Sequence, residues 1–141
     1  MIDKRTGRVL VAPGGPVLFP LMTAREFSRL RITRDMYGTR NYRNYRFEAS
    51  DSRGRSFDGL ACFERSADGN QRILRIHLTY AGIPVTGVDE SLHRLHRWHT
   101  RWLRKLLGVA RERRYSWGCV LADWEIHTPN ATVCIDYRRD G

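Results

Sequence analysis

Residues 74–108 read LRIHLTYAGIPVTGVDESLHRLHRWHTRWLRKLLG, and two different periods of apolar residues follow one another in this segment. It begins with apolar side chains at every second position, namely Leu74, Ile76, Leu78 and Tyr80. That period of two predicts a strand with one buried face. From about Val88 to Leu107 the apolar residues recur every three or four positions instead, which predicts a helix. A strand that leads into a long amphipathic helix predicts a sheet with this helix packed on one face.

The predicted helix has two sides of opposite character. Its apolar side consists of Leu92, Leu95, His99, Trp102 and Leu106. Its opposite side carries Arg94, Arg97, Arg101 and Arg104. The spacings place each set on one face of an α-helix, so the helix is amphipathic and strongly cationic. Gly108 favours termination at that point, because glycine readily adopts the left-handed conformation that follows a helix.

The N-terminal part of the chain is divided into short elements by turn residues. Val9–Val11 and Val17–Phe19 lie on either side of a Pro-Gly-Gly-Pro turn, which predicts a hairpin or a pair of edge strands. Thr23 followed by Glu26 has the spacing of a capping box, because the hydroxyl and the carboxylate can each satisfy a free N–H group. A short helix is therefore expected to begin there.

Strand-like runs fill the remainder of the chain. Three of them lie between Asn41 and Tyr80 and are joined by short turns, which suit antiparallel neighbours. Two more are expected after the long helix, at 117–127 and 132–138, with a turn at 128–131. The sequence thus predicts one α+β domain over residues 1–141. It consists of an antiparallel sheet of roughly five to seven strands, with one long amphipathic helix and one short helix packed against it.

The composition is that of a globular domain with a large positive charge. The chain has 25 Lys and Arg residues against 15 Asp and Glu residues, which gives a formal net charge of +10. Such a charge favours acidic partners, although a genome rich in arginine codons explains it equally well. No run approaches the roughly 20 apolar residues of a membrane span, and no signal peptide is apparent. We therefore expect a cytoplasmic protein in which Cys62, Cys119 and Cys134 are buried free thiols.

No motif in the sequence points to catalysis or to a cofactor. His93, His96 and His99 suggest a shared metal ion, but steps of about 100° per residue spread them widely around the helix. We therefore expect no metal, no cofactor and no enzymatic activity. Several acidic side chains of the predicted strands could still meet in space, which the sequence does not decide. They are Asp58, Glu64, Asp123, Glu125 and Asp136.

Two arginine-rich regions are the candidate binding residues. The first interleaves arginine with tyrosine and comprises Arg40, Tyr42, Arg43, Tyr45 and Arg46. The second is the helix stripe of Arg94, Arg97, Arg101 and Arg104. Guanidinium groups and aromatic rings suit a protein interface, and they also suit phosphates and stacked bases. A protein partner and a nucleic acid therefore both remain open.

Both ends of the chain resemble a loose family of small proteobacterial proteins. The opening segment is DKRTGRVLVAPG at 3–14, and the closing features are Trp102-Leu103, Leu107-Gly108, Trp117-Gly118 and Val133–Tyr137. Proteins of this kind are similar to immunity proteins of contact-dependent or secreted antibacterial toxin systems. The resemblance does not extend to the middle of the chain, and it implies a small α+β fold that binds a protein. Its motifs are structural, so no functional residue is carried over.

These observations lead to one hypothesis and one alternative. The hypothesis is a non-catalytic immunity protein of the cytoplasm that binds and neutralises a cognate toxin. In this hypothesis a basic surface with aromatic anchors meets an acidic patch of the toxin, because charge accelerates association while aromatic side chains supply buried contact. The alternative is a basic nucleic-acid-binding module that uses the Arg/Tyr-rich strands.

Overall fold

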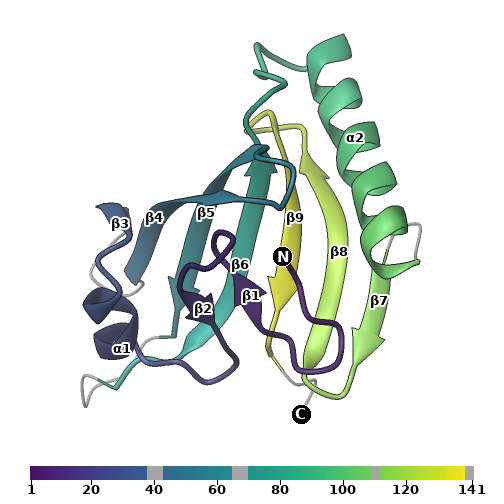
Figure 1. The fold of residues 1–141 in the computed structure, drawn as a ribbon. Helices are drawn as coiled ribbons and strands as arrows, with labels where there is room; N and C mark the ends of the chain where they lie inside the picture. The colour runs from purple at the N-terminus through teal and green to yellow at the C-terminus, as the bar shows by residue number, and fades with distance from the viewer. Residues whose placement is uncertain (38–42, 65–69, 109–111, 139–141) are drawn as a thin grey trace.

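A computed structural model describes residues 1–37, 43–64, 70–108 and 112–138 (Figure 1). The predicted α+β class is confirmed. In chain order the elements are β1 (Val9–Leu10), β2 (Val17–Leu18), α1 (Ala24–Arg29), β3 (Thr33–Tyr37), β4 (Arg43–Ser50), β5 (Ser56–Phe63), β6 (Ile73–Tyr80), α2 (Glu90–Leu107), β7 (Glu112–Tyr115), β8 (Gly118–Glu125) and β9 (Asn130–Asp136). Neither described helix is both long and apolar enough to cross a membrane.

Seven strands form one antiparallel sheet in the order β3-β4-β5-β6-β9-β8-β7. The expected meander is confirmed as β4-β5-β6, and β1 pairs with β2 in a separate two-stranded sheet. The two edge strands, β3 and β7, were not predicted. Strand β7 has the sequence Glu-Arg-Arg-Tyr, which lacks the apolar alternation that marks a half-buried strand. Only pairing with a neighbour makes such a segment a strand.

All the covering elements lie on the same face of the sheet. Phe27 of α1 packs against Tyr45 of β4 and Phe63 of β5, with ring centroids 5.5 Å apart in both cases. Trp102 of α2 lies 4.9 Å from Phe57 of β5, which is on this face as well. Figure 1 shows β1 and β2 in front of the sheet and α2 running beside β8. The opposite face, called the open face below, therefore has no helix over it in the described part of the chain.

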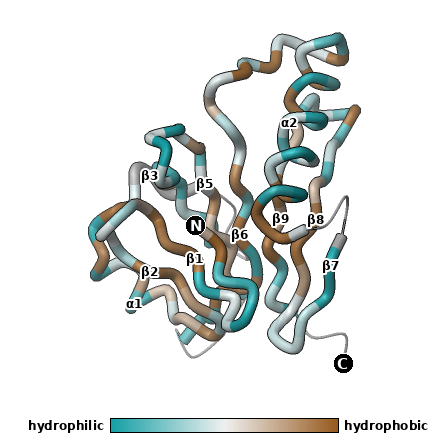
Figure 2. Tube along the Cα trace, turned by 45° about the vertical axis from the view of Figure 1, so that its right-hand side comes forward, coloured by the Kyte–Doolittle hydropathy of each residue, from teal (hydrophilic) through white to brown (hydrophobic). Residues whose placement is uncertain are grey.

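The long helix is attached to the sheet by its apolar side. Figure 2 shows hydrophobic and hydrophilic residues alternating along α2, as the sequence predicts. The buried helix residues are Leu92, Leu95, His99, Trp102, Leu103 and Leu107. The fully buried His99 accepts a hydrogen bond at Nε2 from the Tyr80 backbone N–H, at 3.0 Å. Burial lowers the pKa of His99 to about 4, so this ring is neutral at physiological pH.

Both predicted helix signals are confirmed. The Thr23 hydroxyl accepts from the Glu26 N–H, and the Glu26 carboxylate accepts from the Thr23 N–H, which completes the capping box. Gly108 ends α2 with a φ of 74°, in the left-handed region that glycine tolerates best.

Three details differ from the sequence-based expectation. A bulge between β5 and β6 pairs Phe63 with Ile73, so Ile73 rather than Leu74 is buried. The turn between β8 and β9 occupies 126–129 instead of 128–131, and Glu125 pairs directly with Asn130. Of the three cysteines, only Cys134 is fully buried.

Candidate functional site

The open face is built from the polar positions of the alternating strands. Successive side chains of a strand point to opposite sides, so the neighbours of each core residue belong to this face. The strand pairing aligns Leu60, His77, Cys134 and Leu121 in one row across β5, β6, β9 and β8. Leu60, His77 and Leu121 are half-buried, although no described helix covers this face.

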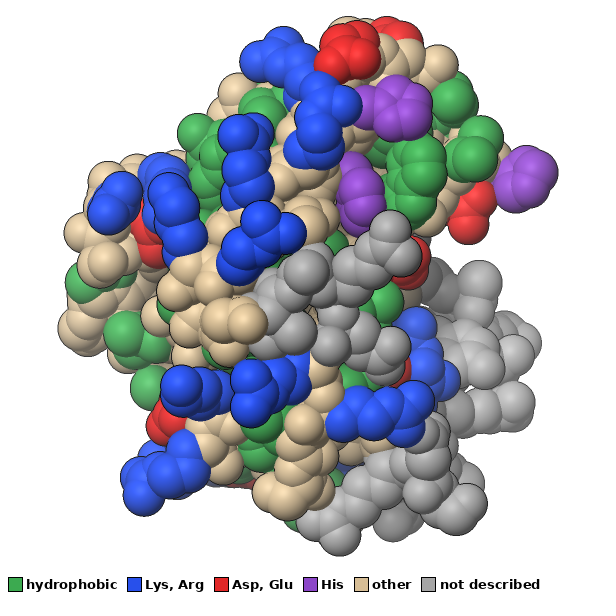
Figure 3. All heavy atoms as spheres, turned by 90° about the vertical axis from the view of Figure 1, so that its right-hand side faces the viewer, with side chains coloured by type: hydrophobic (Ala, Val, Ile, Leu, Met, Phe, Trp, Pro, Cys, Tyr) green, Lys and Arg blue, Asp and Glu red, His purple; other side chains and the backbone are tan. Residues whose placement is uncertain are grey.

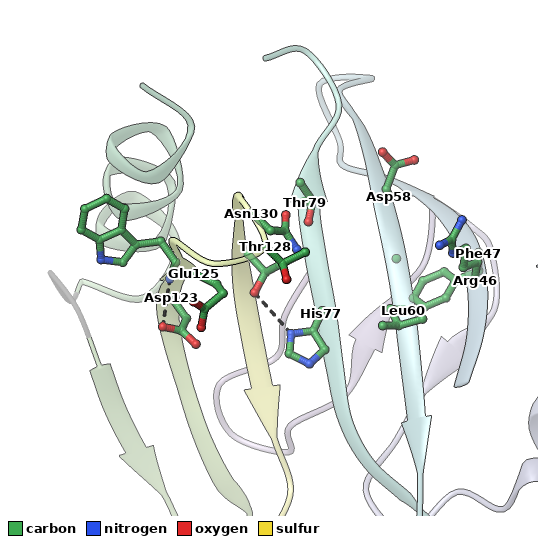
Figure 4. A pocket seen from close by; sticks show the side chains of 13 residues that line it. Arg46, Phe47, Asp58, Leu60, His77, Thr79, Asp123, Glu125, Thr128 and Asn130 are labelled. Carbon is green, nitrogen blue, oxygen red and sulfur yellow. Dashed lines mark hydrogen bonds between the residues drawn. The ribbon is translucent and has the colours of Figure 1, made fainter. Parts of the chain in front are cut away.

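A groove with a volume of about 940 Å³ follows the open face. Figure 4 shows Asp123 and Glu125 of β8 on one side of it, and Asp58, Leu60 and Arg46 on the other. Between them lie His77 and Thr79 of β6 and Asn130 and Thr132 of β9. Strands β6 and β9 pair only over Arg75–Leu78 and 133–136, so the groove residues Thr79 and Asn130 lie beyond the paired part of these strands.

His77 lies in the middle of the groove. Its Nδ1 is 3.3 Å from the Thr132 hydroxyl oxygen, which makes a hydrogen bond between β6 and β9. Burial, followed by the nearby Arg75 guanidinium, lowers the pKa of His77, while Asp123 and Asp136 oppose the shift. The ring is therefore uncharged at neutral pH, and it presents a flat, weakly polar surface rather than a cation.

Two of the three thiols on this face are poor nucleophiles. Burial raises the pKa of Cys134 to about 12 and that of Cys62 to about 11. A thiol reacts as the thiolate, so both groups are in the unreactive form at neutral pH. All three cysteines are free, as expected, but they lie on open-face positions of β5, β8 and β9 rather than in the core.

Four of the five acidic residues singled out in the sequence come together on the open face. Asp58, Asp123 and Glu125 line the groove, while Asp136 lies beyond one end of it. Burial opposes ionisation of Asp136, but hydrogen bonds from the side chain and backbone of Arg138 outweigh it and lower the pKa of this carboxyl. The fifth, Glu64, follows the end of β5 and accepts from the Arg72 N–H.

The structure does not bring the predicted binding residues of the Arg/Tyr segment together. Arg40 and Tyr42 lie outside the described residues. Tyr45 packs into the core against Phe27 and Phe63, with ring centroids 5.5 and 5.6 Å away. Arg46 lines the groove, whereas Arg43 is exposed at the beginning of β4.

The four arginines of the helix stripe form a separate basic surface. Arg94, Arg97, Arg101 and Arg104 are all exposed, and Figure 3 shows basic side chains gathered along this side of the molecule. Arg97 donates to Glu90 at 2.6 Å in an exposed ion pair. Because α2 covers the core face, this stripe and the groove lie on opposite sides of the sheet.

The three helix histidines do not converge. His99 is buried under β6, whereas His93 and His96 lie against the Trp124 ring, with centroids 5.2 and 5.3 Å away. Within the described ranges, no three His, Cys, Asp or Glu side chains are placed to hold a metal ion.

Sequence reasoning missed the groove as a site. Its members, among them His77, Thr79 and Thr132, alternate with apolar residues and were treated as the solvent side of each strand. The available signal was that several open-face positions of these strands carry Leu or Cys, which a fully solvated face rarely collects. Their proximity depends on strand order, which the sequence does not display.

Comparisons with known proteins point to one likeness, at the level of fold. No protein-family model matches the chain, and no curated protein sequence matches it. A solved structure described as Rhs1-CT in complex with its cognate immunity protein RhsI1 contains a similar chain. The TM-score is 0.63 at 16% sequence identity, over 97% of this chain and 86% of the other. The resemblance noted in the sequence is thus confirmed in its fold, which is shared with a chain of a toxin–immunity complex.

Proposed function

We propose that this chain is a non-catalytic immunity protein that binds and neutralises a cognate toxin domain in the cytoplasm. The observation that carries the proposal is the shared fold with a chain of a toxin–immunity complex, over 97% of the present chain. The sequence resemblance at both termini supports the same conclusion. An uncovered antiparallel sheet face also offers the broad surface that a protein partner requires.

The chemistry of the groove supports binding rather than catalysis. Burial holds the Cys62 and Cys134 thiols protonated, which makes both of them poor nucleophiles. His77 is hydrogen-bonded to the Thr132 hydroxyl, but the row beside it consists of leucine and cysteine side chains. Such a surface provides contact area and orientation without an activated group.

A nucleic-acid partner is the second candidate, and the exposed arginine stripe of α2 is the observation in its favour. The described aromatic residues of the Arg/Tyr segment count against it, because Phe47 is buried in the core and the half-buried Tyr45 ring packs against the core instead of standing free for a base. The acidic groove disfavours phosphate as well.

The test is to measure binding of the purified chain to the C-terminal domain of the protein encoded immediately upstream of its gene. Binding to generic duplex and single-stranded nucleic acids is measured in parallel, each at two salt concentrations. We expect a complex with the neighbouring domain whose association slows as salt rises while its dissociation rate barely changes. Tight binding to nucleic acid that weakens steeply with salt, without binding to the neighbouring domain, would instead establish the second candidate.

A further inference from the structure

We infer that the open-face groove is the docking site for the partner, and that its occupant is a cationic, lysine- or arginine-bearing segment of the toxin domain. The inference rests on the proposed function and adds to it the surface and the chemistry of recognition. Three independent features of the described structure carry it: the apolar floor, the exposed hairpin next to it and the sign of the local charge.

The first feature is an apolar floor that the described protein leaves uncovered. Leu60 of β5, which lines the groove, and Leu121 of β8 lie at the two ends of the open-face row, with His77 and the buried Cys134 between them. One face of an antiparallel sheet commonly faces water, and it then carries polar side chains. Burial of these half-exposed leucines by a partner would release water from apolar surface and favour association.

The second feature is the β8–β9 hairpin at the edge of the groove. Ile126 in the turn of this hairpin is 53% exposed. Its burial by a partner would remove apolar surface from water and favour association. The neighbouring Trp124 borders the groove, but its ring stacks on His96 of α2 with an interplanar angle of 18°, so the ring lies on the helix side of the sheet.

The third feature is that the groove lining holds three carboxylates against one guanidinium group, that of Arg46, in a chain whose net charge is +10. The Asp123 carboxylate accepts from the Trp124 N–H and the Glu125 carboxylate from the His127 N–H, both at 2.9 Å. Neither carboxylate forms a salt bridge within the described part of the chain. Two negative groups held on one side of a groove attract a cation and repel a phosphate, which selects a basic protein segment over nucleic acid.

The helix stripe lies on the other side of the sheet and therefore cannot touch a segment bound in the groove. Its arginines change the long-range field of the molecule, which acts on the association rate. Groups that contact the bound segment act on the dissociation rate as well. The dissociation rate therefore distinguishes a docking site in the groove from one on the helix stripe.

The experiment measures association and dissociation rates between variants of this chain and the neighbouring-gene toxin domain. The groove variants are D123N/E125Q and the charge reversal D123K/E125K. The control E64Q/E90Q changes the net charge by the same amount as D123N/E125Q, but at two acids outside the groove. The opposite-face control is R94Q/R97Q/R101Q/R104Q. Circular dichroism and thermal melting confirm that each variant is folded, and hydrogen exchange of the wild-type complex supplies a readout that needs no variant.

We expect D123N/E125Q to raise the dissociation constant about tenfold and D123K/E125K to raise it further, both with faster dissociation. The two controls should keep the dissociation rate of the wild type. Hydrogen exchange should show protection of residues 119–136 in the complex, and not of the outer face of α2.

Three results would overturn the inference. Unchanged affinity of both groove variants, with weaker binding of the α2 variant, would move the docking site to the helix and leave the proposed function standing. Self-association of the chain that D123N/E125Q abolishes would make a second copy the occupant of the groove. Absence of any complex with the wild-type chain would remove the proposed function, and the inference with it.

Discussion

The buried His99 should make the stability of the protein depend on pH. Its imidazole is fully buried, it accepts the Tyr80 N–H at Nε2, and burial followed by the charge of His96 lowers its pKa from 6.5 to about 4. In the unfolded chain the ring has its ordinary pKa. At pH values above the pKa of the unfolded chain, the ring is neutral in both the folded and the unfolded state. Its full contribution to stability is therefore present there.

The sign and size of the effect follow from proton linkage. As pH falls below 6.5 the unfolded state binds a proton that the folded state still excludes, so stability is lost until the folded pKa is reached. A shift of about 2.5 pKa units corresponds to about 3.5 kcal/mol, at about 1.4 kcal/mol per unit. His77 adds to the loss, because its pKa is also lowered by burial.

The assay is urea unfolding, followed by tryptophan fluorescence, across this pH range for the wild type and for H99Q. A glutamine oxygen can accept the Tyr80 N–H but does not titrate, so the variant should be less stable at neutral pH and lose less stability on acidification. H77Q, measured in the same way, isolates the smaller contribution of the groove histidine. An identical slope of unfolding free energy against pH in the wild type and H99Q would refute the reasoning.

Three further predictions concern the elements that hold the fold, each measured as the free energy of unfolding in urea. G118A should lower the free energy of unfolding more than G108A does. Both glycines have positive φ, but a Cβ at Gly118 would also collide with the Asp136 carbonyl oxygen. A Cβ at Gly108 meets open space, so G108A should lower the free energy of unfolding by about 1 kcal/mol. T23A should cost about 1 kcal/mol by removing the capping box, and equal stability of T23A and the wild type would show that α1 is held by packing alone. F57A should cost about 3 to 5 kcal/mol, because the ring is fully buried against Trp102 and Tyr80, and a loss below about 1 kcal/mol would contradict this packing.

Local patterns in the sequence determined the elements that have a strong periodicity or a strong end signal. The alternation around Ile76 and Leu78 produced β6, and the apolar stripe of α2 lies against the sheet because no other arrangement buries it. Thr23 and Gly108 marked helix ends, because capping depends on residues only a few positions apart. The class of fold followed from these elements.

Tertiary structure decided what depends on distant pairing. The edge strand β7 exists only because β8 lies beside it, and the bulge that buries Ile73 instead of Leu74 is a property of two strands together. Tyr45 was predicted as a binding residue, and the structure places its half-buried ring against Phe27 of α1. The local sequence of a strand tyrosine does not show whether its ring packs or is exposed. The groove is the clearest case. Asp58 and Asp123 are far apart in sequence, and they share one face because β9 inserts between β6 and β8, an order that the sequence does not encode locally.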